Sequence, residues 1–189
     1  TVVIQGDDMI VVDCGISFPS EEMPGVDIVI PDFTFLVENK DKLRAVVLTH
    51  AHEDHVGAIP FLLKQIPKVP IYATDFTHAM IRHKMEEKVD IAGTILKHVK
   101  AGDRVKLGAL EVEFIHVTHS IPDTCAIAVH TEHGVVLFTA DFKLDFTPVD
   151  GKVTDLGRLT KLGEEGVVLL LSDSTNVDRP GWSPSESTA

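Results

Sequence analysis

The sequence has few of the residues that stabilise small secreted proteins or form membrane spans. Its 189 residues include two cysteines, Cys14 and Cys125, which lie far apart and form no C-x-x-C pair. This argues against a disulfide-stapled fold and against a cysteine zinc site. No apolar run approaches the roughly 18 residues of a membrane span, and no signal-peptide pattern opens the chain. We therefore expect two buried thiols in a cytoplasmic protein that has no membrane partner.

Positive charge is also scarce. Seventeen lysines and arginines stand against 29 aspartates and glutamates, which gives a formal net charge of −12. This sign favours solubility and is opposite to that of most nucleic-acid-binding domains. The length and the 44% hydrophobic content are sufficient for the core of one domain.

What the chain does have is histidine, concentrated in residues 48–57. His50, His52, Asp54 and His55 follow the apolar run at residues 44–48. Imidazole suits zinc and similar ions, and a carboxylate completes the ligand set. Packing alone gives no reason to place three histidines so close together. The pattern therefore indicates a metal site in the loop after a buried strand.

The spacing of these residues indicates more than one metal ion. On a strand His50 and His52 project to the same side, because side chains alternate with a period of two. A turn then lets Asp54 and His55 reach a second position, before a helix that the apolar spacing predicts at residues 57–66. We expect two metal ions at this strand-to-helix loop.

Two later strands end in further candidate ligands. The alternating segment at 110–117 leads to His119, and the apolar run at 134–140 leads to Asp141. An aspartate after a strand is often a turn or cap residue. Since it follows two other strand ends that carry ligands, we expect Asp141 to bridge the two ions.

Together with Asp13 after an early strand, these motifs resemble the metallo-β-lactamase superfamily. Within it the chain is similar to the ribonuclease J family of β-CASP nucleases. The similar segments are residues 12–15, 18–19, 25–32, 36–40, 118–123, 141–143, 163–166 and 172–176. Ala140 stands where that family usually has glycine before the bridging aspartate, a difference of one methyl group.

The resemblance implies an α/β fold, the metallo-β-lactamase αβ/βα sandwich, of which this chain is the N-terminal half with mixed β-sheets flanked by helices. We expect strands near residues 2–4, 9–13, 27–30, 45–49, 70–73, 110–117, 124–130, 134–140 and 167–172. Helices are expected at 57–66, 75–89 and 154–162. Residues 1–178 belong to this domain, and residues 179–189 begin an inserted β-CASP domain that clamps RNA. A final metal-binding histidine is expected beyond this chain.

The resemblance also implies a metal-dependent ribonuclease acting in RNA processing and decay. It implies two divalent ions, with zinc as the preferred metal and manganese or magnesium as alternatives. These ions are expected to carry a bridging hydroxide that hydrolyses RNA phosphodiesters and leaves 5′-phosphate products. His50, His52 and His119 hold one ion, Asp54 and His55 hold the other, and Asp141 bridges them. Homo-oligomers or RNA-decay partners are expected for the full-length protein, whereas the isolated fragment should be inactive or weakly active.

Four further residues have expected supporting roles. Three residues are predicted to orient the imidazoles by hydrogen bonds to the ring nitrogens that do not bind metal: Asp13, Thr49 and Glu53. Asp13 could instead close the turn before Gly15. Asp173, after a run at 167–171 that we expect to be a buried strand, is predicted to be catalytic with Asp54 and Asp141. By resemblance it orients a later histidine that protonates the leaving oxygen, so it should be unpartnered or bound to water here; the alternative is a turn cap.

The remaining histidines have no predicted role. His78 and His83 are five residues apart and do not share a helical face, so both are predicted to lie on the surface. The same prediction applies to His98, His116, His130 and His133.

Other functions remain open. Another hydrolase on the same fold, such as a glyoxalase II-like thioesterase or a lactamase, would share the metal site. A catalytically incomplete interaction module is the alternative outside enzymes. The acidic charge argues against an RNA substrate unless the basic channel lies elsewhere in the protein.

Overall fold

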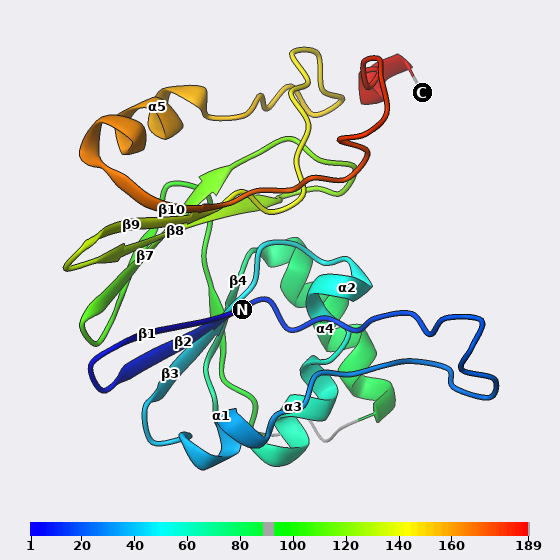
Figure 1. The fold of residues 1–189 in the computed structure, drawn as a ribbon, viewed down its shortest axis with the longest axis vertical. Coiled ribbons are helices and arrows are strands. Elements are labelled where there is room, and N and C mark those ends of the chain that lie inside the picture. The colour runs from blue at the N-terminus through cyan, green and yellow to red at the C-terminus, as the bar shows by residue number, and fades with distance from the viewer. Residues whose placement is uncertain (89–92, 189) are drawn as a thin grey trace.

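In the computed structural model, which describes residues 1–88 and 93–188, two five-stranded sheets face each other and helices cover their outer faces (Figure 1). The first sheet has the order β1-β2-β3-β4-β5 and the second β10-β9-β8-β7-β6. The strands are β1 (Val2–Gln5), β2 (Asp8–Val12), β3 (Leu43–Val47), β4 (Ile71–Ala73), β5 (Leu96–His98), β6 (Arg104–Leu107), β7 (Leu110–His116), β8 (Cys125–Thr131), β9 (Gly134–Phe138) and β10 (Val167–Leu171). The helices are α1 (Thr34–Glu38), α2 (Glu53–Val56), α3 (Ile59–Gln65), α4 (Asp75–Lys88), α5 (Leu156–Glu165) and a short 3₁₀ turn at Glu186–Thr188. The predicted αβ/βα sandwich is confirmed.

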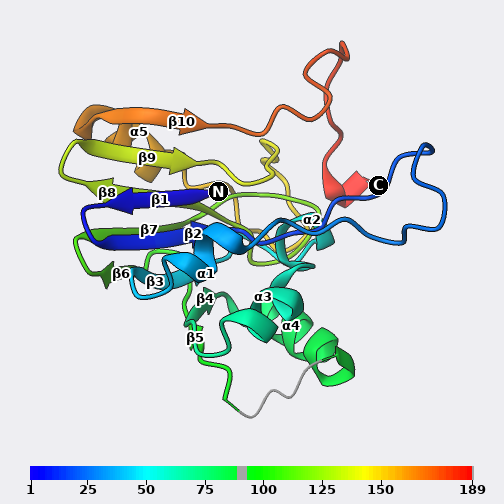
Figure 2. The same ribbon diagram turned by 60° about the horizontal axis from the view of Figure 1, so that its bottom comes forward.

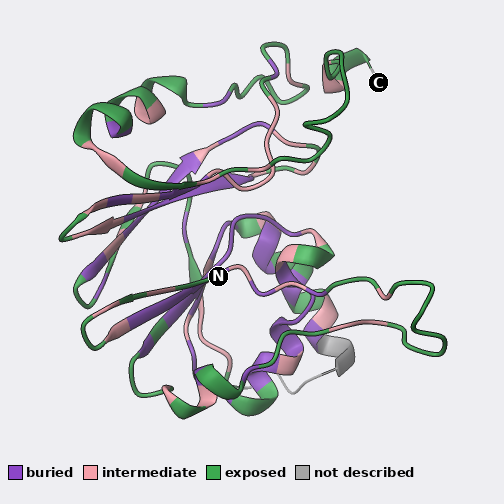
Figure 3. Ribbon diagram, viewed as in Figure 1, coloured by how far each residue is buried: buried purple, intermediate pink, exposed green. Residues whose placement is uncertain are grey.

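Three apolar layers form the core, which Figure 3 shows in purple. The layer between the sheets joins Ile10 and Val12 of β2 to Phe114 of β7. Met9 and Val11 of the same strand point the other way, into the layer under the helices. β2 is therefore apolar on both faces, as expected for a strand covered on both sides.

The chain between β2 and α1 forms a long loop that projects beyond the sheets, seen in dark blue in Figure 2. The strand expected at 27–30 is wrong, because only Val29 pairs, in an isolated bridge with Ser17. Without neighbouring strands the apolar residues there have no sheet to join. Strands β5 and β6 and helix α1 were not predicted, and each is only three to five residues long.

The other predicted elements differ at their ends. The helix expected at 57–66 is found as α3, and a separate short helix that was not predicted, α2, precedes it and contains Asp54 and His55. Helix α4 ends at Lys88, so the last residue of the helix expected at 75–89 lies outside the described residues. Whether residues 179–189 begin a second domain stays a prediction. Within the described ranges, no helix combines the length and apolarity needed to cross a membrane.

β10 is an edge strand and not the buried strand that its sequence predicted. It pairs with β9 alone among the described strands. As a result Val168, Leu169 and Leu170 are each more than half exposed. An unbroken apolar run shows that a strand is suited to burial and does not show that a neighbour covers it.

Helix α5 is fixed to the second sheet by a buried carboxylate on β7. Glu113 accepts hydrogen bonds from Arg158 Nε at 2.6 Å and Nη2 at 3.0 Å, and its Oε2 lies 2.9 Å from His130 Nε2 and from Arg104 Nη2. His130 is therefore half-buried and paired, and the prediction that it lies free on the surface is wrong. One acidic side chain thus connects α5 to β6, β7 and β8.

We predict that Glu113→Ala destabilises the fold by about 1 to 3 kcal/mol, because the buried donors of Arg158 and His130 lose the carboxylate that accepts from them. The matched control is Glu111→Ala, whose more exposed carboxylate on the same strand also pairs with Arg104 and should contribute less than about 1 kcal/mol. Chemical denaturation of both variants measures the difference. Equal losses would show that the buried network does not hold α5.

Candidate metal centre

The candidate ligands meet because the strands that carry them end at one edge of the sandwich. β2 and β3 are parallel, so Asp13 and the loop from Leu48 emerge on the same side. In the second sheet β7 and β9 each run antiparallel to β8, and β10 is parallel to β9. His119, Asp141 and Asp173 therefore follow three strands that point the same way.

One group of ligand atoms comes from both sheets. His50 Nε2 lies 3.0 Å from His52 Nδ1, which lies 3.2 Å from His119 Nε2. An Asp141 carboxylate oxygen lies 3.7 Å from His119 Nε2 and 3.9 Å from His50 Nε2. All four ligand atoms lie within 4.8 Å of one another. Three imidazole nitrogens this close repel unless a proton or a cation lies among them, which fits a metal ion.

A second group shares one residue with the first. It consists of Asp54, His55 and Asp141. His55 Nε2 lies 3.3 Å from Asp141 Oδ1 and 3.7 Å from Asp54 Oδ2. The two oxygens of Asp141 thus face different groups, Oδ2 the first and Oδ1 the second. The structure brings together all six predicted ligands, and the arrangement can hold divalent metal.

Burial and mutual charge set the protonation of these residues. Burial lowers the pKa of His50 to about 3, helped by repulsion from His55 and His119. Burial also lowers the pKa of His119. For His55, hydrogen bonds to Asp13 and Asp141 outweigh burial and raise the pKa to about 10. The hydrogen bond from His55 also lowers the pKa of Asp141 to about 2. At neutral pH the imidazoles of His50 and His119 are therefore unprotonated and Asp141 is an anion, so these three side chains can bind a cation.

Asp13 and Thr49 hold two of the imidazoles from behind. Asp13 Oδ1 accepts the backbone N–H of Thr49 at 2.9 Å, and Oδ2 lies 2.9 Å from the Thr49 hydroxyl and 2.7 Å from His55 Nδ1. The hydroxyl also lies 2.9 Å from His50 Nδ1. Since the hydroxyl has one proton to give, donation to Asp13 leaves it to accept from His50 Nδ1–H. This tautomer leaves the Nε2 lone pair of His50 free for a ligand bond.

A close backbone approach sets the position of α2, and sequence reasoning did not identify it. A Cβ on Gly15 would lie 1.6 Å from the carbonyl oxygen of Asp54. The flanking Cys14 N–H donates to the His55 carbonyl at 2.7 Å, and Ile16 N–H donates to that of Glu53 at 3.0 Å. A glycine directly after the Asp13 motif was the available indication.

Two predicted supporting residues have other partners. The Glu53 carboxylate forms an ion pair with Lys84 of α4, and no hydrogen bond links it to an imidazole within the described residues. Asp173 has hydrogen-bond partners within the chain, contrary to the prediction. Its Oδ1 accepts the Thr175 N–H at 2.8 Å and its Oδ2 accepts the Phe142 N–H at 3.4 Å. Asp173 therefore caps a turn, the alternative that the sequence left open.

The histidines and cysteines outside the site can now be placed. His78 is 1% exposed, so its predicted surface position is wrong; its Nε2 lies 2.9 Å from the Lys97 carbonyl. His116 is half-buried, with Nε2 3.0 Å from the Lys152 carbonyl. Cys14 and Cys125 are buried thiols, as predicted. Burial raises the pKa of both to about 12, which makes them inert near neutral pH.

Comparison with known proteins agrees with this geometry. The profile described as the metallo-beta-lactamase superfamily matches residues 1–171. The chain belongs to the metallo-β-lactamase superfamily. Members with similar sequences are Ribonuclease J of Synechocystis (45% identity over 183 residues) and of Helicobacter pylori strain 26695 (47% over 180 residues). The matches cover 96% and 95% of this chain but only 29% and 26% of those relatives, so the chain spans under a third of their length.

Solved structures share the superfamily fold at low sequence identity. A protein of unknown function from Enterococcus faecalis matches with a TM-score of 0.66 and 19% identity, over 98% of this chain and 49% of its own. Zn²⁺-bound PqqB from Methylobacterium extorquens matches with a TM-score of 0.62 and 13% identity, over 96% and 64%. At these identities the likeness establishes the fold alone.

We predict that Asp13→Ala lowers divalent metal affinity about 10- to 100-fold, because His50 and His55 lose the group that orients them. The control is Asp27→Ala, which removes a carboxylate from the exposed loop before α1. Isothermal titration with Zn²⁺ compares the two variants. Wild-type affinity in Asp13→Ala would show that Asp13 only closes the turn before Gly15.

Proposed function

We propose that this chain supplies the catalytic centre of a metal-dependent ribonuclease of the ribonuclease J type, acting on RNA in the cytoplasm. The observation that carries the proposal is the two ligand groups that share Asp141. It is supported by 45–47% identity to proteins named Ribonuclease J over nearly the whole chain. The superfamily alone would leave the substrate open.

In this proposal each group holds one divalent ion. His50, His52 and His119 would hold the first, Asp54 and His55 would hold the second, and Asp141, which belongs to both groups, would serve each. Nitrogen and carboxylate donors together suit zinc, and manganese would also accept them. A metal pair lowers the pKa of a bound water and offsets the charge that builds on a phosphodiester during cleavage.

The surrounding residues prepare the site for a phosphate. Asp13 and Thr49 fix the imidazole orientations, so that the ligand atoms need not reorganise when the ions bind. The Asp54 side chain is 56% accessible, which supports an approach of substrate from its side. Two bound dications would also offset part of the negative charge that otherwise repels RNA.

Asp173 has a second role in this proposal, despite capping its turn. It follows β10 at the same edge as the ligands, and its charge acts on the pKa of His119. A carboxylate held by the Thr175 and Phe142 amides is fixed in direction. It would orient the group that protonates the leaving oxygen. General acid catalysis of this kind raises a rate about 100- to 10,000-fold.

We predict that Asp141→Ala in the product of the complete gene removes most hydrolysis of a 5′-monophosphorylated RNA, because neither group then retains its shared ligand. Metal analysis should find fewer ions per chain. Near wild-type hydrolysis would contradict the two-metal proposal. Intact metal binding in the wild type, with no RNA cleavage but turnover of a thioester such as S-lactoylglutathione, would indicate a different hydrolase.

A separate prediction concerns Asp173→Asn in the same full-length protein. The amide oxygen still accepts the Thr175 N–H, and only the longer bond from the Phe142 N–H is lost. Folding and metal content should therefore not change while the cleavage rate falls at least about 100-fold. The pH–rate profile should lose its limb at high pH, where a general acid acts. A variant that loses metal or stability, with its remaining active fraction turning over normally, would show that Asp173 is structural.

A further inference from the structure

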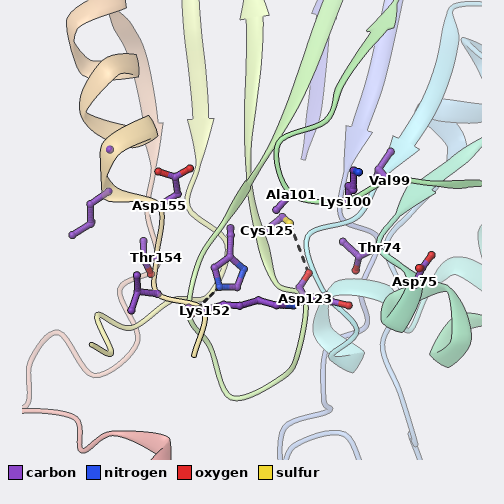
Figure 4. A pocket seen from close by; sticks show the side chains of 14 residues that line it. Thr74, Asp75, Val99, Lys100, Ala101, Asp123, Cys125, Lys152, Thr154 and Asp155 are labelled. Carbon is purple, nitrogen blue, oxygen red and sulfur yellow. Dashed lines mark hydrogen bonds and ion pairs between the residues drawn. The ribbon is translucent and has the colours of Figure 1, made fainter. Parts of the chain in front are cut away.

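A large cavity lies beside the metal centre, with a volume of about 790 Å³. Val99, Lys100 and Ala101, after β5, lie on one side of it (Figure 4). The segment before α5, including Thr154, lies on the other, with Cys125 between them. None of the six candidate metal ligands lines this cavity. Its volume falls in the range of small-molecule sites, about 300 to 1,000 Å³.

A smaller cavity shares part of its lining with this one and also reaches a candidate metal ligand. It has a volume of about 240 Å³ and His119 forms part of its wall. The two cavities share three residues, His116, Asp123 and Lys152. A molecule in the large cavity would therefore contact residues that also line the smaller cavity, whose wall includes the candidate ligand His119.

The walls of the large cavity suit a flat, uncharged ring. Val99, Ala101, Val153 and Leu156 give the lining apolar surface. Cys125 adds a further apolar surface, since burial keeps its thiol protonated. Apolar walls with a few polar groups are typical of sites for small organic molecules.

Two lysines on opposite walls provide cations. Among the described residues, the Lys152 ammonium pairs with Asp123 alone, at 3.5 Å. Both side chains are exposed, so the pair can open at little cost. Lys100 is exposed and forms no ion pair with any residue in the described part of the chain.

The other carboxylates of the lining are already engaged. Asp75 lies 2.6 Å from His98 Nδ1, and Asp155 caps α5 by accepting the Arg158 N–H. Asp123 pairs with Lys152, and opening of that exposed pair would leave its carboxylate to accept a donor, such as the amino group of a base.

We propose that this cavity binds a single nucleotide, with its base between the apolar walls and its phosphate between Lys100 and Lys152. The inference rests on the proposed nuclease function, which gives the site a reason to lie beside the metal centre. The nucleotide comes either from the RNA during cleavage or from the mononucleotide that cleavage releases. Both sources present the same ring and phosphate.

Titration of AMP into the chain in the presence of EDTA tests this inference without metal or turnover. Wild-type protein should bind AMP more tightly than adenosine or inorganic phosphate. Lys152→Met and Lys100→Met should each weaken AMP binding about tenfold or more, as expected for a lost charge-assisted contact. Val153→Trp should block the cavity. Lys161→Met, which alters an exposed lysine of α5 outside the cavity, should bind AMP as the wild type does.

Asp141→Ala should bind AMP normally, which separates this site from the metal centre and its test from that of the nuclease proposal. If the dinucleotide pApA competes with AMP, the site accepts a base of an RNA chain; if it does not, the site is specific for the released mononucleotide. Absence of AMP binding by the wild type, or an equal loss in Lys161→Met, would overturn the inference. Circular dichroism of each variant controls for folding.

Discussion

The carboxylate of Asp141 and the imidazoles around it form the interaction on which the rest of the structure depends. Four histidine rings lie close together at one edge of the sandwich, with centroid distances from His50 of 4.0 to 4.9 Å. Bringing them together costs free energy unless opposite charge is present. Asp141 supplies that charge from the opposite sheet, and bound cations would add to it.

The fold can maintain this arrangement because its supports lie outside it. The apolar layer between the sheets fixes β3 against β7 and β8. The ligands His50 and His119 follow the ends of β3 and β7 within a few residues. Asp13 and Thr49 then fix two rings by hydrogen bonds, while Gly15 allows α2 to approach β2. A site on strand ends varies less in position than one on a free loop, which favours a defined metal geometry.

The predictable parts of this structure are those that a short stretch of sequence determines. The H-x-H-x-D-H spacing and the aspartates after apolar strands identified residues that the structure brings together, because strand direction determines where a strand end lies. β5 and β6 escaped prediction because short, polar strands carry little periodicity. Partners such as Lys84 for Glu53, or Lys97 for His78, are set by tertiary packing, so no pattern within one segment contains them. The exposure of β10 likewise depends on neighbours and not on its own residues.

The central claim is that two ions bind side by side through a shared Asp141, and a count and location of bound metal tests it most directly. A crystal of this chain grown with Zn²⁺ and measured above and below the zinc absorption edge would locate each ion by its anomalous signal. The account predicts two peaks, one among His50, His52 and His119 and one between Asp54 and His55, with an Asp141 oxygen coordinating each ion. A single peak, or two peaks that Asp141 does not contact, would contradict it.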